Sequence, residues 1–364
     1  MPEEQTRDAA DVRVAIIGYG LAGAVFHAPL VAATPGMRVA AIVTGNPQRQ
    51  AQARRDYPDA AIYASADDLW THRETLDLVV VAAPNRAHAA LAVAALEAGL
   101  AVVVDKPFAP SSAEATRVIE TAERAGRPMS VFQNRRWDND FLTLRRLIAA
   151  DLLGPLTRFE SRFERFRPLP KAEAWRELEA PEEAGGLLFD LGAHLIDQAL
   201  LLFGQPTSVY AEMSARRPGA VVDDDTFVAL RFADDVVAHL WMSAIPRKFG
   251  PRYRVVGLRG VYEKEHLDPQ EEALRMGLRP GMEGWGHEPA DRWGTLYTQV
   301  GDVPLVSRVE TAPGRYEAYY AGMRDAIREG APVPVDPHDA LNALRVIEAA
   351  RVSAREGRLA PLGG

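Results

Sequence analysis

The sequence VRVAIIGYGLAG, which spans Val12–Gly23, decides the fold of this 364-residue chain. Its first six residues are rich in β-branched side chains and predict a buried strand, while the apolar run Ala24–Val31 predicts a helix after it. The G-x-G-x-x-G glycines suit the junction: Gly18 permits a tight turn, Gly20 lets a ligand approach the backbone, and Gly23 lets the helix pack near the strand. This context predicts a dinucleotide site, with the phosphates on free N–H groups at the helix N-terminus.

Short β-rich runs alternate with helical patterns through the first third of the chain. This alternation is typical of βαβ units that build a parallel, doubly wound sheet, so we predict an α/β Rossmann domain over residues 1–133. The strands expected in this domain are Val12–Ile17, Val39–Val43, Leu78–Ala82, Ala101–Val104 and Met129–Phe132.

After Phe132 the pattern changes, and we assign residues 134–364 to a second, α+β domain for substrate binding and oligomerisation. Helices are predicted near Asp138–Ala150 and Gly186–Phe203, and a last helix near 337–356 is expected to pack back on the first domain. The strand candidates are longer and mostly consecutive, which favours a large, mostly antiparallel, open sheet. These candidates are Leu156–Phe166, Ser208–Ser214, Thr226–Phe232, Val236–Ala244 and Tyr253–Val256.

The segment Glu263–Leu296 is rich in Gly, Pro and charged residues and contains Trp285 and Trp293. We expect little regular structure in it. Such an excursion either lids or pads a binding site, or it is a plain surface insertion. Both interpretations stay open on the sequence.

Composition excludes several classes of protein. The formal net charge is −8, from 42 basic and 50 acidic residues, and no basic block argues for a nucleic acid or an anionic membrane as partner. No apolar run is long enough to span a bilayer, and Met1–Asp11 lacks the apolar core of a secretion signal. With no cysteine, there is no disulfide, thiol nucleophile or Cys-ligated zinc. We therefore expect a cytoplasmic protein with a small-molecule partner.

The end of the second predicted strand bears on the choice of cofactor. An acidic side chain there would bind the ribose 2′-hydroxyl of NAD, but no acid follows Val43 closely. Thr44, Asn46 and Arg49 instead suit a 2′-phosphate. We predict NADP as the preferred cofactor, with NAD possible; the alternative is an exposed loop with a surface arginine.

The turn after Leu78–Ala82 lies at the carboxyl edge of the predicted sheet, where ligands of open α/β sheets collect. Asn85 can cap the next helix and touch the cofactor, whereas His88 alone is more typical of a structural residue at a helix start. With the turns already described, the predicted cofactor-binding residues are Gly18, Tyr19, Gly20, Leu21, Ala22, Gly23, Thr44, Asn46, Arg49, Pro84, Asn85, His88 and Lys106.

Lys106 follows the predicted strand Ala101–Val104 and precedes Pro107. A lysine at the carboxyl end of a buried strand can point its ammonium into the cofactor cleft, bind a substrate hydroxyl and favour the developing alkoxide. A solvated lysine after a strand is the commoner interpretation of such a residue taken alone. The motif described next favours a catalytic role for Lys106 over that of a solvated surface lysine.

That motif is GGLLFDLGAHLID, Gly185–Asp197. On a helix, Asp190 and His194 share one face, because they are four residues apart. A histidine with a neighbouring carboxylate can act as base near neutral pH, which is needed when a hydroxyl loses its proton as hydride leaves carbon. Asp197 either continues the row of polar residues formed by Asp190 and His194 or has only a structural role. A metal site on Asp190 and His194 is the alternative, but no third ligand stands at a telling spacing, so we predict no metal.

The glycine-rich turn, the Lys106-Pro107 pair and the Asp190-x-x-x-His194 spacing together resemble the Gfo/Idh/MocA oxidoreductases over nearly the whole chain. The resemblance implies a Rossmann domain followed by a domain built on an open, largely antiparallel sheet. It also implies Lys106, Asp190 and His194 as the polar catalytic set, with His194 as proton acceptor, and a homodimer or homotetramer. One departure is Asp105, where Glu usually precedes the Lys-Pro pair.

Three further stretches narrow the resemblance to the branch that contains NADP-dependent scyllo-inositol dehydrogenases. They are Phe26–Pro29, Gln133–Asp138 and Leu267–Gln270.

Substrate contacts are expected from polar and aromatic residues close in the chain to the cleft. Arginine and aspartate bind hydroxyls and tryptophan covers apolar ring faces, so a polyol, inositol or sugar suits such a site, although each residue alone is more often structural. The predicted substrate-binding residues are Lys106, Arg135, Trp137, Arg162, Trp175, Asp190 and His194.

The sequence thus predicts an NAD(P)-dependent dehydrogenase or reductase acting on CH–OH groups, in which the cofactor carries the redox chemistry. Three alternatives stay open: a non-enzymatic sensor on the same scaffold, a glycosidase that retains NAD, and an imine or biliverdin-type reductase. The intact set of Lys106, Asp190 and His194 argues against the sensor. The absent ribose-binding acid after Val43 argues against the glycosidase.

Overall fold

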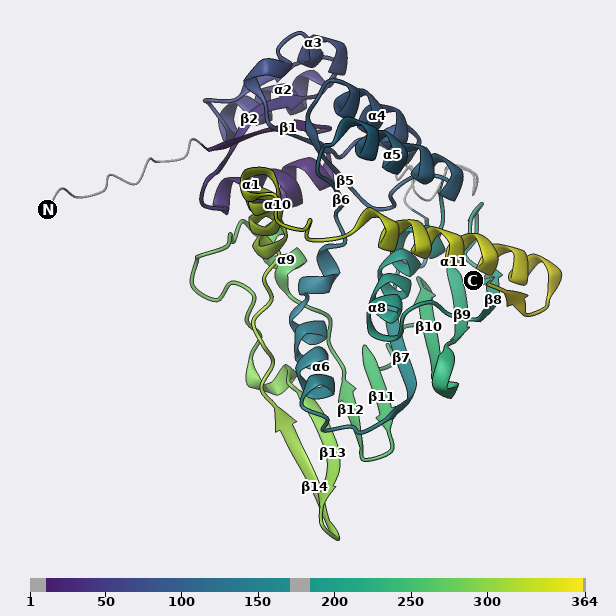
Figure 1. The fold of residues 1–364 in the computed structure, drawn as a ribbon. Helices are drawn as coiled ribbons and strands as arrows, with labels where there is room; N and C mark the ends of the chain where they lie inside the picture. The colour runs from purple at the N-terminus through teal and green to yellow at the C-terminus, as the bar shows by residue number, and fades with distance from the viewer. Residues whose placement is uncertain (1–10, 171–183, 363–364) are drawn as a thin grey trace, which may run out of the picture.

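The computed structural model describes residues 11–170 and 184–362. They form two sheets, one beyond the other along the molecule, with helices around and between them (Figure 1). An α/β Rossmann domain holds the first sheet and an α+β domain holds the second, so the predicted fold class is confirmed.

The first sheet has six strands, all parallel, in the order β3-β2-β1-β4-β5-β6. Its central strands are buried on both faces, which is why they appear in the sequence as continuous apolar runs. The order reverses between β1 and β4, so a ligand crevice opens at the carboxyl end of β1. The strands are β1 (Val12–Ile17), β2 (Met37–Val43), β3 (Ala61–Tyr63), β4 (Leu78–Val81), β5 (Ala101–Val104) and β6 (Met129–Val131).

Helices cover both faces of this sheet. α4 and α5 pack on one face, and α1 and α10 lie together on the other, where Tyr319 and Tyr320 of α10 share a buried cluster with Leu30 and Val31 (Figure 1). Residues from the end of the chain therefore complete the first domain. The helices are a π-helical turn (Ala22–His27) that continues into α1 (Ala28–Ala33), α2 (Pro47–Asp56), α3 (Ala66–Trp70), α4 (His88–Glu97), α5 (Ser112–Ala125) and α10 (Glu317–Glu329).

The second sheet has nine strands in the order β14-β13-β12-β11-β7-β10-β9-β8-β15. Only β7 and β10 are parallel neighbours; the other described pairs are antiparallel. Its strands are β7 (Leu156–Glu164), β8 (Ser208–Ser214), β9 (Asp225–Arg231), β10 (Val237–Ser243), β11 (Tyr253–Gly257), β12 (Gly260–Lys264), β13 (Gly294–Val300), β14 (Val303–Val309) and β15 (Ala360–Pro361).

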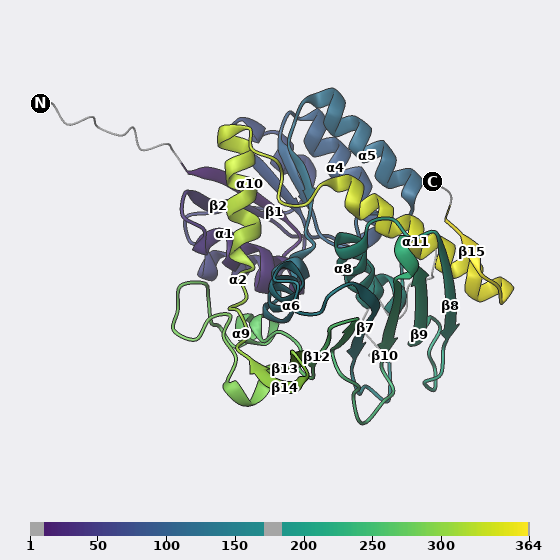
Figure 2. The ribbon, with the colours of Figure 1, turned by 60° about the horizontal axis from the view of Figure 1, so that its bottom comes forward.

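The helix α11 (Pro337–Glu356) joins the two domains. It runs between the α4–α5 pair and the strands β8 and β9, as Figure 2 shows, and it packs against α8 (Ala193–Phe203). Both oxygens of Glu348 accept hydrogen bonds from Ser112 of α5, one from its N–H and one from its hydroxyl, each at 2.7 Å. Together with α6 (Asn139–Ala149), these helices hold the second sheet against the first domain and set the width of the space between them.

The segment Glu263–Leu296 contains little regular structure, as the sequence predicts. Between β12 and β13 the described backbone holds only the short helix α9 (Gln270–Arg275) and a 3-10 turn at Ala290–Arg292. The two ends of the segment belong to β12 and β13, which were not predicted because these strands are defined by pairing with each other, and local composition does not encode that pairing. Trp285 is buried and donates a hydrogen bond to Glu317 of α10 at 2.9 Å, so the segment is packed against the body of the protein.

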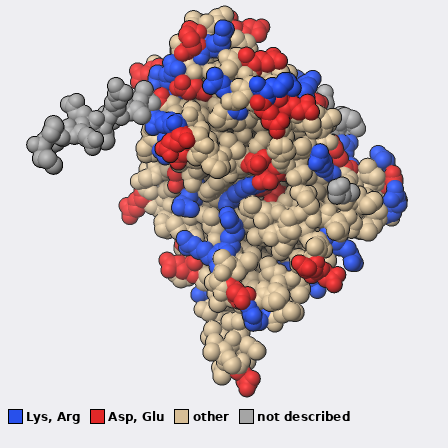
Figure 3. All heavy atoms as spheres, viewed as in Figure 1, with Lys and Arg blue, Asp and Glu red and all other residues tan. Residues whose placement is uncertain are grey.

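Charged side chains of both signs are interspersed over the face in Figure 3, whereas the projecting β13–β14 hairpin is largely uncharged. Throughout residues 11–170 and 184–362, no helix combines the length and the apolar character needed to cross a membrane.

Candidate active site

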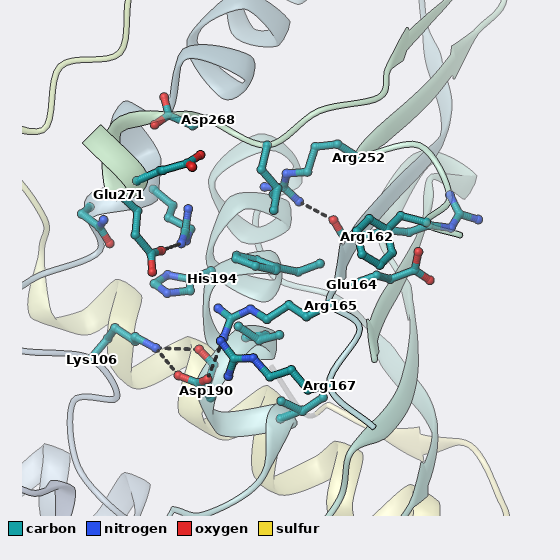
Figure 4. A pocket seen from close by; sticks show the side chains of 18 of the residues that line it. Lys106, Arg162, Glu164, Arg165, Arg167, Asp190, His194, Arg252, Asp268 and Glu271 are labelled. Carbon is teal, nitrogen blue, oxygen red and sulfur yellow. Dashed lines mark hydrogen bonds and ion pairs between the residues drawn. The ribbon is translucent and has the colours of Figure 1, made fainter. Parts of the chain in front are cut away.

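A cavity of about 720 Å³ opens where the carboxyl edge of the first sheet meets the second domain. Residues that follow β1, β5 and β6 line one side of it, and residues of β7, the start of α8 and the α9 segment line the other. Lys106, Asp190 and His194 come together in this cavity (Figure 4). The fold therefore brings the predicted catalytic set to one place.

The glycine-rich turn forms a cradle beside the cavity. Gly18 has a φ of 101°, and a Cβ on it would clash with the carbonyl oxygen of Ala82. A Cβ on Gly23 would clash with the carbonyl oxygen of Gly18, so the helix lies as close to the turn as backbone atoms permit. The first N–H groups of a helix lack partners within it, and here the helical turn that begins at Ala22 follows Gly18 and Gly20 closely. A cradle that side chains would fill fits the pyrophosphate of a dinucleotide.

Two neighbours of these glycines play different parts. Tyr19 is buried, and its hydroxyl donates a hydrogen bond to Asp56 at 2.8 Å, which anchors the turn to the end of α2. Leu21 and Ala22 instead line the cavity. Only the latter two therefore present side chains toward a ligand there.

Thr44, Asn46 and Arg49 lie where β2 runs into α2. The Asn46 side chain accepts hydrogen bonds from the N–H groups of Gln48 at 2.9 Å and Arg49 at 3.1 Å, so it caps the helix. Arg49 is exposed, and its Nη1 lies 3.6 Å from where a Cβ on Gly20 would stand. Among the described residues, no carboxylate lies within ion-pair distance of this guanidinium.

The turn after β4 fixes the position of Lys106. The Asn85 amide donates to the carbonyl of Ala184 at 3.3 Å and makes no capping hydrogen bond, so the prediction that Asn85 caps the next helix is wrong. The ring nitrogens of His88 lie 2.8 Å from the carbonyl oxygen of Pro107 and 2.9 Å from that of Ala83. His88, in the same turn as Pro84 and Asn85, therefore holds the Lys106-Pro107 turn in place. The Lys106–Pro107 peptide bond is cis.

The Lys106 ammonium is held by Asp190. It donates to the carboxylate at 2.9 Å and to the main-chain carbonyl of the same residue at 2.6 Å. The side chains of Lys106 and Asp190 are 13% and 21% exposed, so the pair faces the cavity and keeps some access to it. No hydrogen bond joins Asp190 to His194 in the described part of the chain. The carboxylate therefore orients the lysine rather than the imidazole.

His194 lies in the first turn of α8, directly after a π-helical turn over Leu188–Gly192. Burial lowers the pKa of His194 well below 6.5, and the charges of Lys106 and Arg135 lower it further. The imidazole is therefore neutral at pH 7, and a neutral imidazole can accept a proton. Its Nδ1 is buried and has no hydrogen-bond partner among the described residues.

Two of the other predicted substrate residues, Arg135 and Arg162, also line the cavity. Arg135 is buried between Asp138 at 3.3 Å and Glu271 at 2.7 Å. The guanidinium of Arg162 stacks over the ring of Trp241, 3.8 Å from its centroid.

Trp137 packs against Tyr319 and does not line the cavity, and Trp175 lies outside the described residues. Asp197 pairs with the buried Arg136 at 2.6 Å, so it is structural.

Sequence reasoning missed several charged residues of the cavity. Arg165, Arg167 and Glu271 line it, yet none stands in a motif. The alternation Phe163, Arg165, Arg167 at the end of the predicted strand Leu156–Phe166 was the available signal, since residues two apart on a strand share one face.

A held ammonium and a buried neutral imidazole in one cavity, with a glycine cradle beside it, fit an NAD(P)-dependent oxidoreductase. Comparison with known proteins agrees. Residues 12–133 match the family model described as "Oxidoreductase family, NAD-binding Rossmann fold", and residues 145–362 match "Oxidoreductase family, C-terminal alpha/beta domain". The chain belongs to the Gfo/Idh/MocA family of oxidoreductases.

Relatives span the whole chain. The uncharacterized oxidoreductase YdgJ of Escherichia coli (strain K12) is 40% identical, over 95% of this chain and 97% of its own. The scyllo-inositol 2-dehydrogenase (NADP(+)) IolW of Bacillus subtilis (strain 168) is 36% identical, over 97% of this chain and 96% of its own. The solved structure of yvaA from Bacillus subtilis superposes with a TM-score of 0.92 at 34% identity, covering 98% of this chain and all of that one.

Proposed function

We propose that this protein uses NADP to oxidise a secondary alcohol of a polyol, inositol or sugar, or to reduce the matching ketone. The observation that carries the proposal is the meeting of Lys106, Asp190 and His194 in one cavity beside the glycine cradle. Further support comes from the family, which includes the NADP-dependent inositol dehydrogenase IolW and a D-apiose dehydrogenase.

The bound nicotinamide supplies the hydride acceptor, and the chain supplies binding and proton transfer. His194 takes the hydroxyl proton, because its imidazole is neutral and buried next to the ammonium. Lys106 donates a hydrogen bond to the same oxygen and stabilises its developing negative charge. Asp190 holds that ammonium at 2.9 Å, so it is a positioning residue.

The preference for NADP rests on Arg49. Its exposed guanidinium stands near Gly20 without a carboxylate partner among the described residues, and no acid follows β2 to bind a ribose 2′-hydroxyl. Arginine binds phosphate through paired, charge-assisted hydrogen bonds.

We expect Arg49→Gln to raise the Kd for NADPH by about 10- to 100-fold, because it removes a charge-assisted hydrogen bond, and to leave the Kd for NADH nearly unchanged. Fluorescence titration of both reduced cofactors measures this. Arg54→Gln, at the far end of α2, is the matched control and should change neither value. Equal loss of both cofactors would contradict the assignment of Arg49 to the 2′-phosphate.

We propose also that the protein self-associates through the β13–β14 hairpin, as a homodimer or homotetramer. Val300, Val303 and Val306 on this hairpin are 69%, 67% and 64% exposed, and exposed apolar surface of this kind marks an interface.

The double variant Val303→Glu/Val306→Glu should sediment as a monomer, because it places charge in the proposed interface, while Leu359→Glu at another exposed apolar position should not change the sedimentation coefficient. A monomeric unmodified protein in the same run would refute the self-association.

Turnover tests the main proposal. Purified protein with NADP+ and a panel of inositols, aldoses and ketoses should produce reduced cofactor with at least one member, followed by absorbance. Nucleotide binding without turnover on any member favours a sensor, and absence of nucleotide binding contradicts the proposed function.

A further inference from the structure

Two arginines just beyond the end of β7 face the proposed reaction centre. Pairing with β10 continues there, since the N–H of Arg165 donates to Ser243 at 2.9 Å and that of Arg167 donates to Ala244 at 2.8 Å. Residues two apart in an extended chain share a face, and both arginines line the cavity. Figure 4 shows their guanidiniums directed toward Asp190. Neither arginine has a role in the proton transfer described above.

Cations outnumber anions at this point. One oxygen of the Asp190 carboxylate accepts from Lys106 at 2.9 Å, and the other lies 3.9 Å from the Arg165 guanidinium. Across the described residues, no carboxylate lies within ion-pair distance of Arg167. Among the described residues, Lys106 and Arg165 both lie at the Asp190 carboxylate, and Arg167 beside them has no carboxylate within ion-pair distance.

Nearby acids are engaged elsewhere. Glu271 pairs with Arg135 at 2.7 Å and Arg275 at 2.9 Å, and although burial alone would raise the pKa of Glu271, these arginines lower it to about 2. Glu164 accepts a hydrogen bond from the N–H of Gly250 at 2.7 Å. Glu271 attracts Arg165 through space, but among the described residues neither Glu271 nor Glu164 forms an ion pair with Arg165 or Arg167.

Burial makes this excess costly. The Arg165 side chain is 25% exposed, and burial lowers the pKa of Arg165, with the like charge of Arg167 acting in the same direction. Arginine nonetheless stays protonated, so burying its charge lowers the stability of the folded protein unless an anion binds beside it. An anion that enters with the substrate removes that cost.

We propose that the substrate carries a carboxylate or phosphate group, and that Arg165 and Arg167 bind this group while the reacting carbinol lies at Lys106 and His194. The inference rests on the proposed function and narrows its substrate class from neutral polyols to acidic sugars or sugar phosphates. The planar guanidinium matches both anions, which accept paired hydrogen bonds. Lys106 and Arg165 contact the same carboxylate, so one hexose-sized molecule spans both ends of the site.

Calorimetric titration of the NADP+-saturated protein tests this with matched ligands: D-glucose, D-glucuronate and D-glucose 6-phosphate. At least one acid should bind about tenfold or more tightly than glucose, because it gains charge-assisted hydrogen bonds. Arg167→Met should remove that advantage, and Arg167→Lys should restore part of it. Arg158→Met, on β7 itself but outside the cavity and 48% exposed, should leave it intact. The acid that binds more tightly distinguishes a carboxylate site from a phosphate site.

The inference is overturned if glucose binds as tightly as both acids, if neither acid binds, or if Arg167→Met preserves the advantage while NADP+ affinity is normal. Each of these outcomes leaves the proposed oxidoreductase standing. Failure of the unmodified protein to bind NADP+ would instead contradict the proposed function itself.

Discussion

Replacing His194 with Ala lowers kcat for alcohol oxidation by about 10²- to 10⁴-fold, the usual contribution of a positioned general base. His194 is 4% exposed, lines the cavity with Lys106 and has a pKa well below 6.5, so it is the neutral acceptor for the hydroxyl proton. Steady-state rates of cofactor reduction measure the loss. The Kd for NADPH should stay unchanged, because His194 lies on α8 and away from the glycine-rich turn.

The pH dependence gives a second test of the same residue. A base with a depressed pKa stays neutral down to acidic pH, so kcat/KM for oxidation should hold level through pH 6.5 and fall only well below it. His194→Asn keeps a polar side chain of similar reach. It should have a much lower kcat/KM, and its pH profile should no longer show the fall at acidic pH. An Asn variant that keeps full activity, or an unmodified enzyme that loses half its activity at pH 6.5, would show that another group is the base.

Replacing Lys106 with Met lowers kcat by about 10²- to 10³-fold, comparable to the loss of one donor to a developing oxyanion. The effect has two sources, since Met neither donates to the substrate oxygen nor holds Asp190 as the ammonium does at 2.9 Å. Cofactor reduction by the Met variant, measured at saturating substrate, gives the value.

The same variant should also move the acidic limb of the pH profile. The charge of Lys106 is one of the causes that depress the pKa of His194, so its removal raises that pKa and shifts the limb toward higher pH. Lys264→Met is a control for loss of a lysine, because Lys264 is fully buried with Glu288 outside the cavity; it should lower thermal stability without shifting the limb. An unshifted limb in Lys106→Met would mean that the two side chains do not interact.

The Rossmann half of the fold could be predicted from sequence because its elements are locally encoded. β1 occupies the same residues as predicted, and α11 coincides with the expected last helix, whose start is marked by Asp336 and Pro337. The strands of the second domain predicted from alternation lie within two residues of their expected bounds.

Other elements carry too little local signal. β3 is three residues long and lies at a sheet edge, partly exposed, so it shows no run of apolar side chains. β12, β13 and β14 are defined by pairing with one another, and exposed positions such as Val303 hide the contrast between buried and solvent-facing residues. α10 packs on α1, nearly 300 residues earlier in the chain, as the hydrogen bond from Arg324 to Pro35 at a separation of 289 shows.

The site shows the same division. Lys106, Asp190 and His194 stand in motifs, so the sequence predicted that they share one site. The structure was needed to show that Asp190 binds Lys106, because the two residues are 84 positions apart in the chain. Arg162 and Trp137 were predicted as substrate contacts from chain proximity alone; Arg162 lines the cavity, whereas Trp137 packs on Tyr319 outside it. Arg165 and Arg167 line the cavity because they are two residues apart in an extended segment, and no sequence motif contains them.

Transfer of a labelled hydride tests the central claim most directly. The protein is incubated with NADPH carrying deuterium at the transferable C4 position and with a panel of keto-polyols and ketosugars that includes acidic members, and the products are analysed by mass spectrometry. We predict one deuterium on the carbinol carbon of a product, formed at least about 100-fold more slowly by His194→Ala. Label that stays in the cofactor, or a glycoside cleaved without net oxidation of NADPH, would contradict the account.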